Sequence, residues 1–267
     1  MNFLKNKTLL IVSNWGYPFG GGEEYLYQTA IWANNIKMKC YWLCFSNANN
    51  KPYETLDIKK IDGMTIIKIP DGFNQNNLYN WMRLINPDIV HHQGHHRKLF
   101  YEICKLQRIE FVTGIHFWGG IIQLDQTHRN VNIIENYNKH KTDPEFEELF
   151  DDPYCTFYSV SKFVTNAVKL ITNKEIPYYA YSGSLKEKCL VKNNVPAKNK
   201  YVTIINIHEM KGGKILLYLL KRLPNIPFMV IKTEYNSENL DNQIKNLIEK
   251  SNGVSIYLER TKKKKKI

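Results

Sequence analysis

Short apolar runs alternate with longer amphipathic stretches along almost all of this 267-residue sequence. Runs of strand length occur at residues 9–13, 39–45 and 111–115, for example, and helix-length segments separate many of them. Two parallel neighbouring strands need a crossover of a dozen residues or more, and a helix usually supplies it. The alternation therefore predicts an α/β fold built from parallel βαβ units.

The first two thirds of the chain carry most of this pattern. Residues 118–141 have weaker periodicity and residues 143–152 are acidic, which predicts a long excursion between two strands. Ser161 is expected to cap the helix that follows this excursion. The predicted strands are 9–13, 39–45, 65–69, 88–92, 111–115, 156–160 and 178–181, and the other predicted helices are 23–36, 78–85 and 98–108.

A polar, basic, proline-bearing stretch then interrupts the pattern. We predict a linker at residues 186–200, between an N-terminal Rossmann-like domain (1–185) and a second βαβ unit (201–258). The second unit has only three predicted strands, fewer than a doubly wound domain usually has, so we expect this domain to be incomplete. Its strands are predicted at 201–206, 228–231 and 254–258 and its helices at 213–223 and 238–250, and residues 259–267 are expected to form a disordered basic tail.

The composition narrows the possible partners and location. The net charge is +12, and five of these charges lie in Lys262 to Lys266. A basic excess suits nucleic acid, membrane surfaces and phosphorylated small molecules alike, and nucleic acid ranks last because the sequence has no helix-turn-helix or RNA-binding signature. The five cysteines are odd in number with no Cys-x-x-Cys pair, and no run approaches the ~18 apolar residues of a membrane span. We therefore expect reduced thiols and a soluble, cytoplasmic protein.

The strongest local signal is the glycine run Gly20, Gly21 and Gly22, which precedes Glu23 directly after the first predicted strand. Glycines let the backbone approach a ligand, and the N-terminus of the next helix offers N–H groups to a phosphate. A tight turn that needs positive φ angles explains the glycines equally well. The spacing differs from the dinucleotide fingerprint, and no P-loop lysine follows, so nicotinamide dehydrogenases and P-loop ATPases are disfavoured.

A histidine and a lysine that each follow a predicted strand are further candidate site residues. His116 follows the strand at 111–115, at the edge where open α/β sheets place their chemistry, although a lone histidine is more often structural. Lys211 with Gly212 and Gly213 opens a helix of the second unit and could bind an anion, as could any basic loop. The histidines of segment 91–96 have no metal-ligand spacing and no nearby acidic ligand, so we predict no metal site.

Five motifs in order along the chain resemble the GT-B glycosyltransferases of family 4, which are retaining enzymes similar to sucrose synthase. The resemblance extends over some 230 residues and includes the N-terminal acceptor domain but only the beginning of the nucleotide-sugar domain. The motifs are Pro18–Glu24, Asn86–His91, Val112–His116, Tyr158–Val164 and Met210–Gly213, the last followed by Leu223-Pro224.

The resemblance implies a GT-B-like protein with two Rossmann-like domains that transfers a sugar from a nucleotide-diphosphate donor to an unidentified acceptor. It implies no metal and no cofactor besides the donor substrate. His116 would lie beside the reacting sugar, and Lys211 would neutralise the leaving diphosphate. The other donor-binding residues implied are Gly20, Gly21, Gly22, Glu23, Gly212 and Gly213.

The chain departs from the family pattern at two places. Asn206 stands where the family usually has an arginine, five residues before Lys211, and the Glu-x7-Glu segment that holds the donor's sugar and ribose is missing. We therefore expect a C-terminally truncated chain, with a frame slip at an adenine run encoding Lys262 to Lys266 as one hypothesis. Either a partner chain supplies the missing part, or the protein is an impaired remnant or a sugar-nucleotide-binding module.

Overall fold

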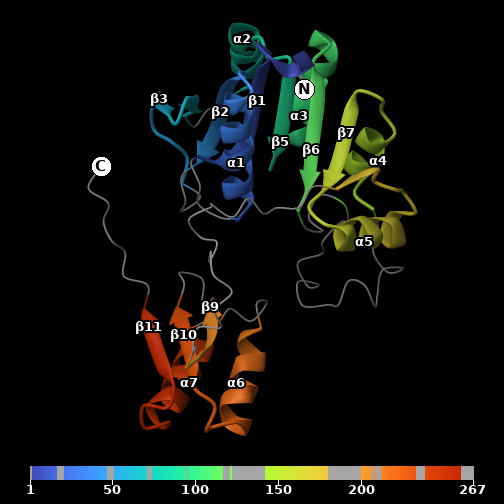
Figure 1. Ribbon diagram of the computed structural model, residues 1–267. Coiled ribbons are helices and arrows are strands. Elements are labelled where there is room, and N and C mark those ends of the chain that lie inside the picture. The colour runs from blue at the N-terminus through green and yellow to red at the C-terminus, as the bar shows by residue number, and fades with distance from the viewer. Residues whose placement is uncertain are drawn as a thin grey trace. The chain divides into compact units, whose positions relative to one another are not determined.

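The computed structural model describes residues 2–16, 21–46, 51–70, 74–94, 96–116, 121, 142–179, 200–205, 207, 212–232 and 238–259. The chain divides into two compact units, residues Met1–Glu187 and Lys188–Ile267. Figure 1 labels the α-helices and most of the strands of both units.

Unit 1 is organised around an eight-stranded sheet whose order is β3-β4-β2-β1-β5-β6-β7-β8. All neighbouring strands pair in parallel except β3 and β4, which form an antiparallel pair. The parallel α/β prediction is thus confirmed. The strands are β1 (Thr8–Trp15), β2 (Lys39–Ser46), β3 (Asp57–Ile61), β4 (Met64–Lys68), β5 (Ile89–Gln93), β6 (Glu110–Ile115), β7 (Cys155–Ser159) and β8 (Tyr178–Tyr179).

Helices cover both faces of this sheet. Helix α1 packs on one face, called the α1 face below, where Leu26 and Ala30 join Ile11 and Trp42 in a buried core. The other described helices of unit 1 contribute to a second core on the opposite face. The helices are α1 (Gly21–Asn35), α2 (Gln75–Ile85), α3 (Arg97–Gln107), α4 (Pro144–Phe150) and α5 (Lys162–Thr172), and a short 3-10 turn, η1 (Asn2–Leu4), precedes β1.

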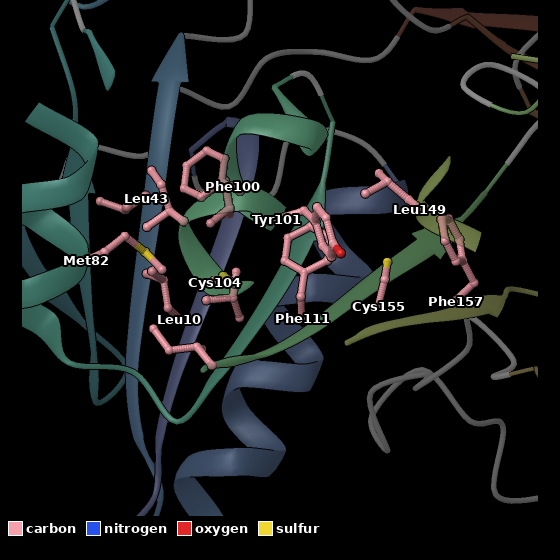
Figure 2. Close-up of a cluster of buried hydrophobic side chains, with 14 of the residues drawn as sticks. Leu10, Leu43, Met82, Phe100, Tyr101, Cys104, Phe111, Leu149, Cys155 and Phe157 are labelled. Atoms are coloured by element: carbon pink, nitrogen blue, oxygen red, sulfur yellow. The ribbon is translucent and has the colours of Figure 1, made fainter. Parts of the chain in front are cut away.

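The core on the opposite face is formed by side chains that alternate along the strands. Leu10, Leu43 and Phe111 point from three strands toward Met82 of α2 and Phe100 of α3 (Figure 2). All five side chains are fully buried. Burial of side chains of this size contributes roughly 1.5–3 kcal/mol each, so this core fixes how α2 and α3 lie on the sheet.

Besides the short η1 turn, one strand and one α-helix of unit 1 were not predicted from the sequence. Strand β3 forms a hairpin with β4 through Asp62 and Gly63, which have φ angles of 50° and 81°. Helix α4 lies inside the predicted irregular excursion, and Asp143 caps it by accepting hydrogen bonds from the N–H groups of Glu145 and Phe146. Asp-Gly is a preferred hairpin dipeptide and Asp-Pro a helix start, so both signals were present in the sequence.

Unit 2 contains a three-stranded parallel sheet in the order β11-β10-β9. Leu216, Leu220 and Ile244 from its two helices pack against Val230 on one face of the sheet. The elements are β9 (Val202–Ile205), α6 (Gly213–Arg222), β10 (Phe228–Lys232), α7 (Glu238–Glu249) and β11 (Ile256–Glu259), which agrees with the predicted order.

The second face of this sheet is apolar and is not covered by the described helices of unit 2. Ile205 is 63% exposed and Leu258 is 42% exposed. Register places both beside Ile231, since Ile205 and Leu258 each pair with this residue. Parallel sheets are normally buried on both faces, so this exposed face is unusual for the architecture.

The described cysteines and helices can be compared with the predictions of reduced thiols and of no membrane span. Cys40, Cys44, Cys104 and Cys155 are free and buried, while Cys189 lies outside the described residues. Burial raises the pKa of the Cys44 thiol to about 12, so this thiol stays protonated and unreactive near neutral pH. Among the residues described, no helix combines the length and the apolar character needed to cross a bilayer.

Truncation of a side chain on the helix-covered face of the unit 2 sheet should destabilise unit 2 more than truncation of its neighbour on the exposed face. Ile204→Ala removes contacts with the helix-side core and should lower the free energy of unfolding of unit 2 by about 1–3 kcal/mol. Ile205→Ala, on the exposed face, should change it by less than about 0.5 kcal/mol. Hydrogen exchange of β10 under native conditions measures both values, and equal effects would contradict the assignment of faces.

Candidate functional site

A cluster of aromatic and histidine side chains lies at the carboxyl edge of the unit 1 sheet, on the α1 face. His91 comes from β5, His116 directly follows β6, Tyr158 comes from β7 and Tyr25 comes from α1. Parallel strands bring their carboxyl ends to one edge, and the pairing of Gly114 with Tyr158 aligns β6 with β7. Residues from four separate segments thereby meet at one place.

The side chains of this cluster are in direct contact. The Nε2 atom of His91 lies 2.8 Å from the hydroxyl of Tyr158. The ring centroid of Tyr25 lies 5.6 Å from that of His116 and 6.0 Å from that of Tyr158. The rings of His116 and Tyr158 are 6.4 Å apart and meet edge to face. We call Tyr25, His91, His116 and Tyr158 the edge cluster.

Gly114 makes this close packing possible. A Cβ atom at this position would lie 2.5 Å from the hydroxyl oxygen of Tyr158 and 3.0 Å from Nε2 of His116. Both distances are shorter than normal contacts, so any larger residue would displace at least one of the two side chains. A glycine is therefore required at position 114, because two side chains come too close to the backbone of β6 to leave room for a Cβ atom.

Burial keeps both histidines of the edge cluster neutral near pH 7. It lowers the pKa of His116 to about 4, and it lowers the pKa of His91 to about 4 with a further contribution from His116. Burial also raises the pKa of Tyr158 well above its usual value. The Nε2 atom of His116 is buried and has no hydrogen-bond partner within the described part of the chain. His116 can thus offer a neutral imidazole nitrogen to a ligand.

The N-terminus of α1 borders the edge cluster and contains part of the glycine run. Gly21 and Gly22 form the first turn of the helix with negative φ angles, so the alternative of a positive-φ turn is wrong for these two residues. A Cβ at position 22 would come within 2.3 Å of Nε2 of Gln93, from the end of β5. Glu23 is 5% exposed, and the dipole of α1 favours its negative charge at this end. Gly20 lies outside the described residues.

The histidine-rich segment 91–96 is divided between environments. His91 belongs to the edge cluster, whereas His92 stacks against Phe100 and Phe111 on the opposite face. His96 precedes α3, and His95 lies outside the described residues. Because successive residues of a strand point to opposite faces, these neighbours in sequence cannot bind one ion together. The described residues include no group of three or more potential metal ligands.

In unit 2 the predicted anion site is described only in part. Lys211 and Asn206 lie outside the described residues. Gly212 has a φ angle of +88° and is the N-cap residue of α6, so no side chain caps the first turn of this helix. A Cβ on Gly213 would lie 2.0 Å from the carbonyl oxygen of Ile207. The turn itself therefore requires both glycines, whether or not a ligand binds there.

Sequence reasoning missed Tyr25, Gln93 and Tyr158 as members of this site. Tyr158 falls inside the strand predicted at 156–160, and Tyr25 falls inside the helix predicted at 23–36. One signal was available for Tyr158, because it lies near the carboxyl end of a strand in a parallel sheet. Tyr25 carried no such signal, since its place depends on how α1 packs on the sheet.

Comparisons with known proteins add information at the level of the fold. No family model matches the sequence, and no curated protein matches it. Among solved structures, a glycosyltransferase from Rickettsia africae ESF-5 is similar with a TM-score of 0.59 and 14% identity. The match covers 96% of this chain and 69% of that chain. The chain has the fold of the GT-B glycosyltransferases.

A second match supports this GT-B fold and agrees on how much of it the chain contains. A trehalose-6-phosphate structure from Escherichia coli, bound with UDP-2-fluoro glucose, has a TM-score of 0.56 and 14% identity. The match covers 95% of this chain and 74% of that chain. About a quarter to a third of each of the two neighbours thus has no counterpart here, in agreement with a second unit of three strands.

Acidification should destabilise unit 1 through its buried histidines. The pKa of His91 is near 6.5 in the unfolded chain and about 4 in the folded chain. Between these two pH values the unfolded state therefore binds more protons than the folded state. The free energy of unfolding should fall from pH 7 to pH 5, by on the order of 1–2 kcal/mol for His91. His91→Gln should reduce this slope. Urea unfolding followed by tryptophan fluorescence measures it in unit 1, which holds all five tryptophans, and an unchanged slope would contradict the assignment.

Gly213→Ala should destabilise unit 2, because the new methyl group would clash with a backbone carbonyl that cannot easily move. We expect a loss of about 2–3 kcal/mol, measured by hydrogen exchange in α6 and β10. The matched control is Gly21→Ala, also at the first position of a helix, where nothing lies within 4 Å of the new Cβ. Its effect on the stability of unit 1 should stay within about 0.5 kcal/mol.

Proposed function

We propose that this protein is a glycosyltransferase that transfers a sugar from a nucleotide-diphosphate donor to an acceptor. The observation that carries the proposal is the edge cluster in a GT-B fold, in which His116 has a buried Nε2 atom with no partner in the described part of the chain. Carboxyl edges of parallel sheets are where α/β proteins bind ligands, so a buried polar atom at this edge suits a binding site.

In this proposal His116 contacts the reacting sugar. A neutral imidazole can accept or donate one hydrogen bond at Nε2, depending on its tautomer, and it adds no charge to the site. A sugar ring offers hydroxyl groups of both kinds. His116 therefore suits recognition and orientation of a sugar hydroxyl, and a hydrogen bond that strengthens in the transition state would accelerate transfer.

The leaving diphosphate requires positive potential. When the bond between the anomeric carbon and the diphosphate oxygen breaks, the oxygen keeps the electron pair and gains negative charge. Lys211 and the first turn of α6, which has no side-chain cap, are suited to stabilise this charge. Backbone groups of Gly212 and Gly213 would take part. The backbone of Gly20, Gly21 and Gly22, with Glu23, would contact the donor from unit 1.

The remaining properties of the proposal follow the family resemblance. They are retention of configuration, membership of family 4, independence of metal ions and a cytoplasmic location. The donor class has support from the Escherichia coli neighbour, which was solved with a UDP-sugar analogue. The four free, buried cysteines are compatible with a reducing compartment.

We also propose that contacts to the donor's sugar and ribose come from polypeptide outside these 267 residues. The fold neighbours extend beyond the part matched here, and the exposed apolar face of the unit 2 sheet is suited to further packing. The competing possibility is a module that binds sugar nucleotides without transferring the sugar. Measurements of binding and of turnover distinguish the two.

The first experiment measures binding. The purified chain is heated with a panel of nucleoside diphosphates, and a selective ligand should raise the melting temperature, because ligand bound to the folded state stabilises it. Lys211→Ala should weaken binding about 10-fold or more, as expected for loss of a charge-assisted hydrogen bond. Lys221→Ala, in the last turn of α6, is the matched control and should have no effect. A flat panel would contradict the proposal.

The second experiment measures turnover of nucleotide sugars by hydrolysis or transfer. His116→Ala should lower kcat about 100-fold or more while the fold is retained, because a transition-state hydrogen bond is lost. Unchanged turnover in this variant would remove the role assigned to His116. Binding without turnover in the unmutated chain would instead favour the non-catalytic module.

A further inference from the structure

The hydroxyl of Tyr158 has no role in the proposed transfer, although it lies at the centre of the edge cluster. Tyr158 is 7% exposed, so its hydroxyl needs partners inside the protein. One is present, since Nε2 of His91 lies 2.8 Å from this hydroxyl. The ring of Tyr25 lies beside that of Tyr158, with 6.0 Å between the two centroids.

The hydrogen bond and the ring contact join three separate segments of unit 1. His91 lies in β5, Tyr158 in β7 and Tyr25 in the second turn of α1. The ring of Tyr25 lies in turn against His116, at 5.6 Å between centroids. Movement of Tyr158 would therefore release Tyr25, and with it both the start of α1 and the ring that packs against His116.

We propose that Tyr158 is a positioning residue for His116: its hydroxyl binds His91, its ring packs against Tyr25, and these two contacts hold the first turns of α1 and the imidazole of His116 in a fixed relation. A ligand-binding role for His116 rests on the proposed function, but the positioning role of Tyr158 does not depend on which ligand binds. Gly114 contributes to the same arrangement, because it leaves room for the Tyr158 hydroxyl beside His116.

The protonation of His116 provides a readout of this role. The titratable groups around it in the described structure are Tyr25 from α1, His91 from β5 and Tyr158 from β7. Burial lowers the pKa of His116 to about 4, so displacement of Tyr25 that admits water should raise it toward the usual value near 6.5. A hydroxyl that only added stability would leave this pKa unchanged.

The test is Tyr158→Phe, with the side-chain titrations of the histidines followed by NMR in the full chain. We expect the pKa of His116 to rise by about one unit or more. The melting temperature should fall by about 4–8 °C, since Nε2 of His91 loses its partner. The matched control is Tyr154→Phe, which removes a hydroxyl from a side chain 47% exposed just before β7 and should change neither value.

A second variant keeps the inference testable if Tyr158→Phe does not fold. Tyr25→Leu removes the half-buried ring that packs between Tyr158 and His116, and it should raise the pKa of His116 in the same way. A His116 titration within about 0.2 units of the unmutated chain in the folded variant would overturn the inference.

Failure of the positioning role of Tyr158 and failure of the proposed function give different experimental results. The histidine titrations need no ligand, so they report on Tyr158 even when no nucleoside diphosphate binds. Conversely, selective binding of UDP with an unchanged His116 titration in Tyr158→Phe would leave the proposed function in place and overturn the positioning role.

Discussion

The parallel pairing of β5, β6 and β7 is the constraint on which the candidate site depends. Parallel strands all end at the same edge of the sheet, and the register pairs Gly114 with Tyr158. A shift of one residue in this register would turn Tyr158 toward the opposite face and leave His91 without its partner. The edge cluster thus exists because backbone hydrogen bonds between distant segments fix the register. The apolar cores on both faces hold that sheet in place.

The polar side chains of the edge cluster can be buried together because none of them carries a charge near neutral pH. Transfer of a charged imidazole from water into the protein is costly, so the two histidines remain neutral, and the hydroxyl of Tyr158 satisfies His91. His116 is the exception, since its Nε2 atom is buried and has no partner among the described residues. This contrast between His91, which has a partner for its Nε2 atom, and His116, which has none in the described structure, is the basis for the ligand-binding role proposed for His116.

Much of the fold was predictable because its signals are local. The strands and helices at 9–13, 23–36 and 111–115 follow from apolar periodicity, and the serine cap of α5 was identified directly. Strand β3 was missed because its sequence, Asp-Ile-Lys-Lys-Ile, has few apolar residues, as suits an edge strand exposed to water. Helix α4 was missed because its acidic residues outweighed Phe146 and Leu149, which are the side chains that it buries. Position at an edge or a surface weakened the hydrophobic signal in both cases.

The sequence by itself determined the parallel α/β class, the order of most elements, and the glycines at the starts of α1 and α6, because these depend on periodicity and on backbone conformation over a few residues. It also marked His116 as the end of a strand. Only the tertiary structure decided that Tyr25 and Tyr158 accompany this histidine, that His91 and His92 separate to opposite faces, and that Gly114 leaves space for a phenol. Such relations depend on strand register and helix packing between segments far apart in the chain, which no local pattern records.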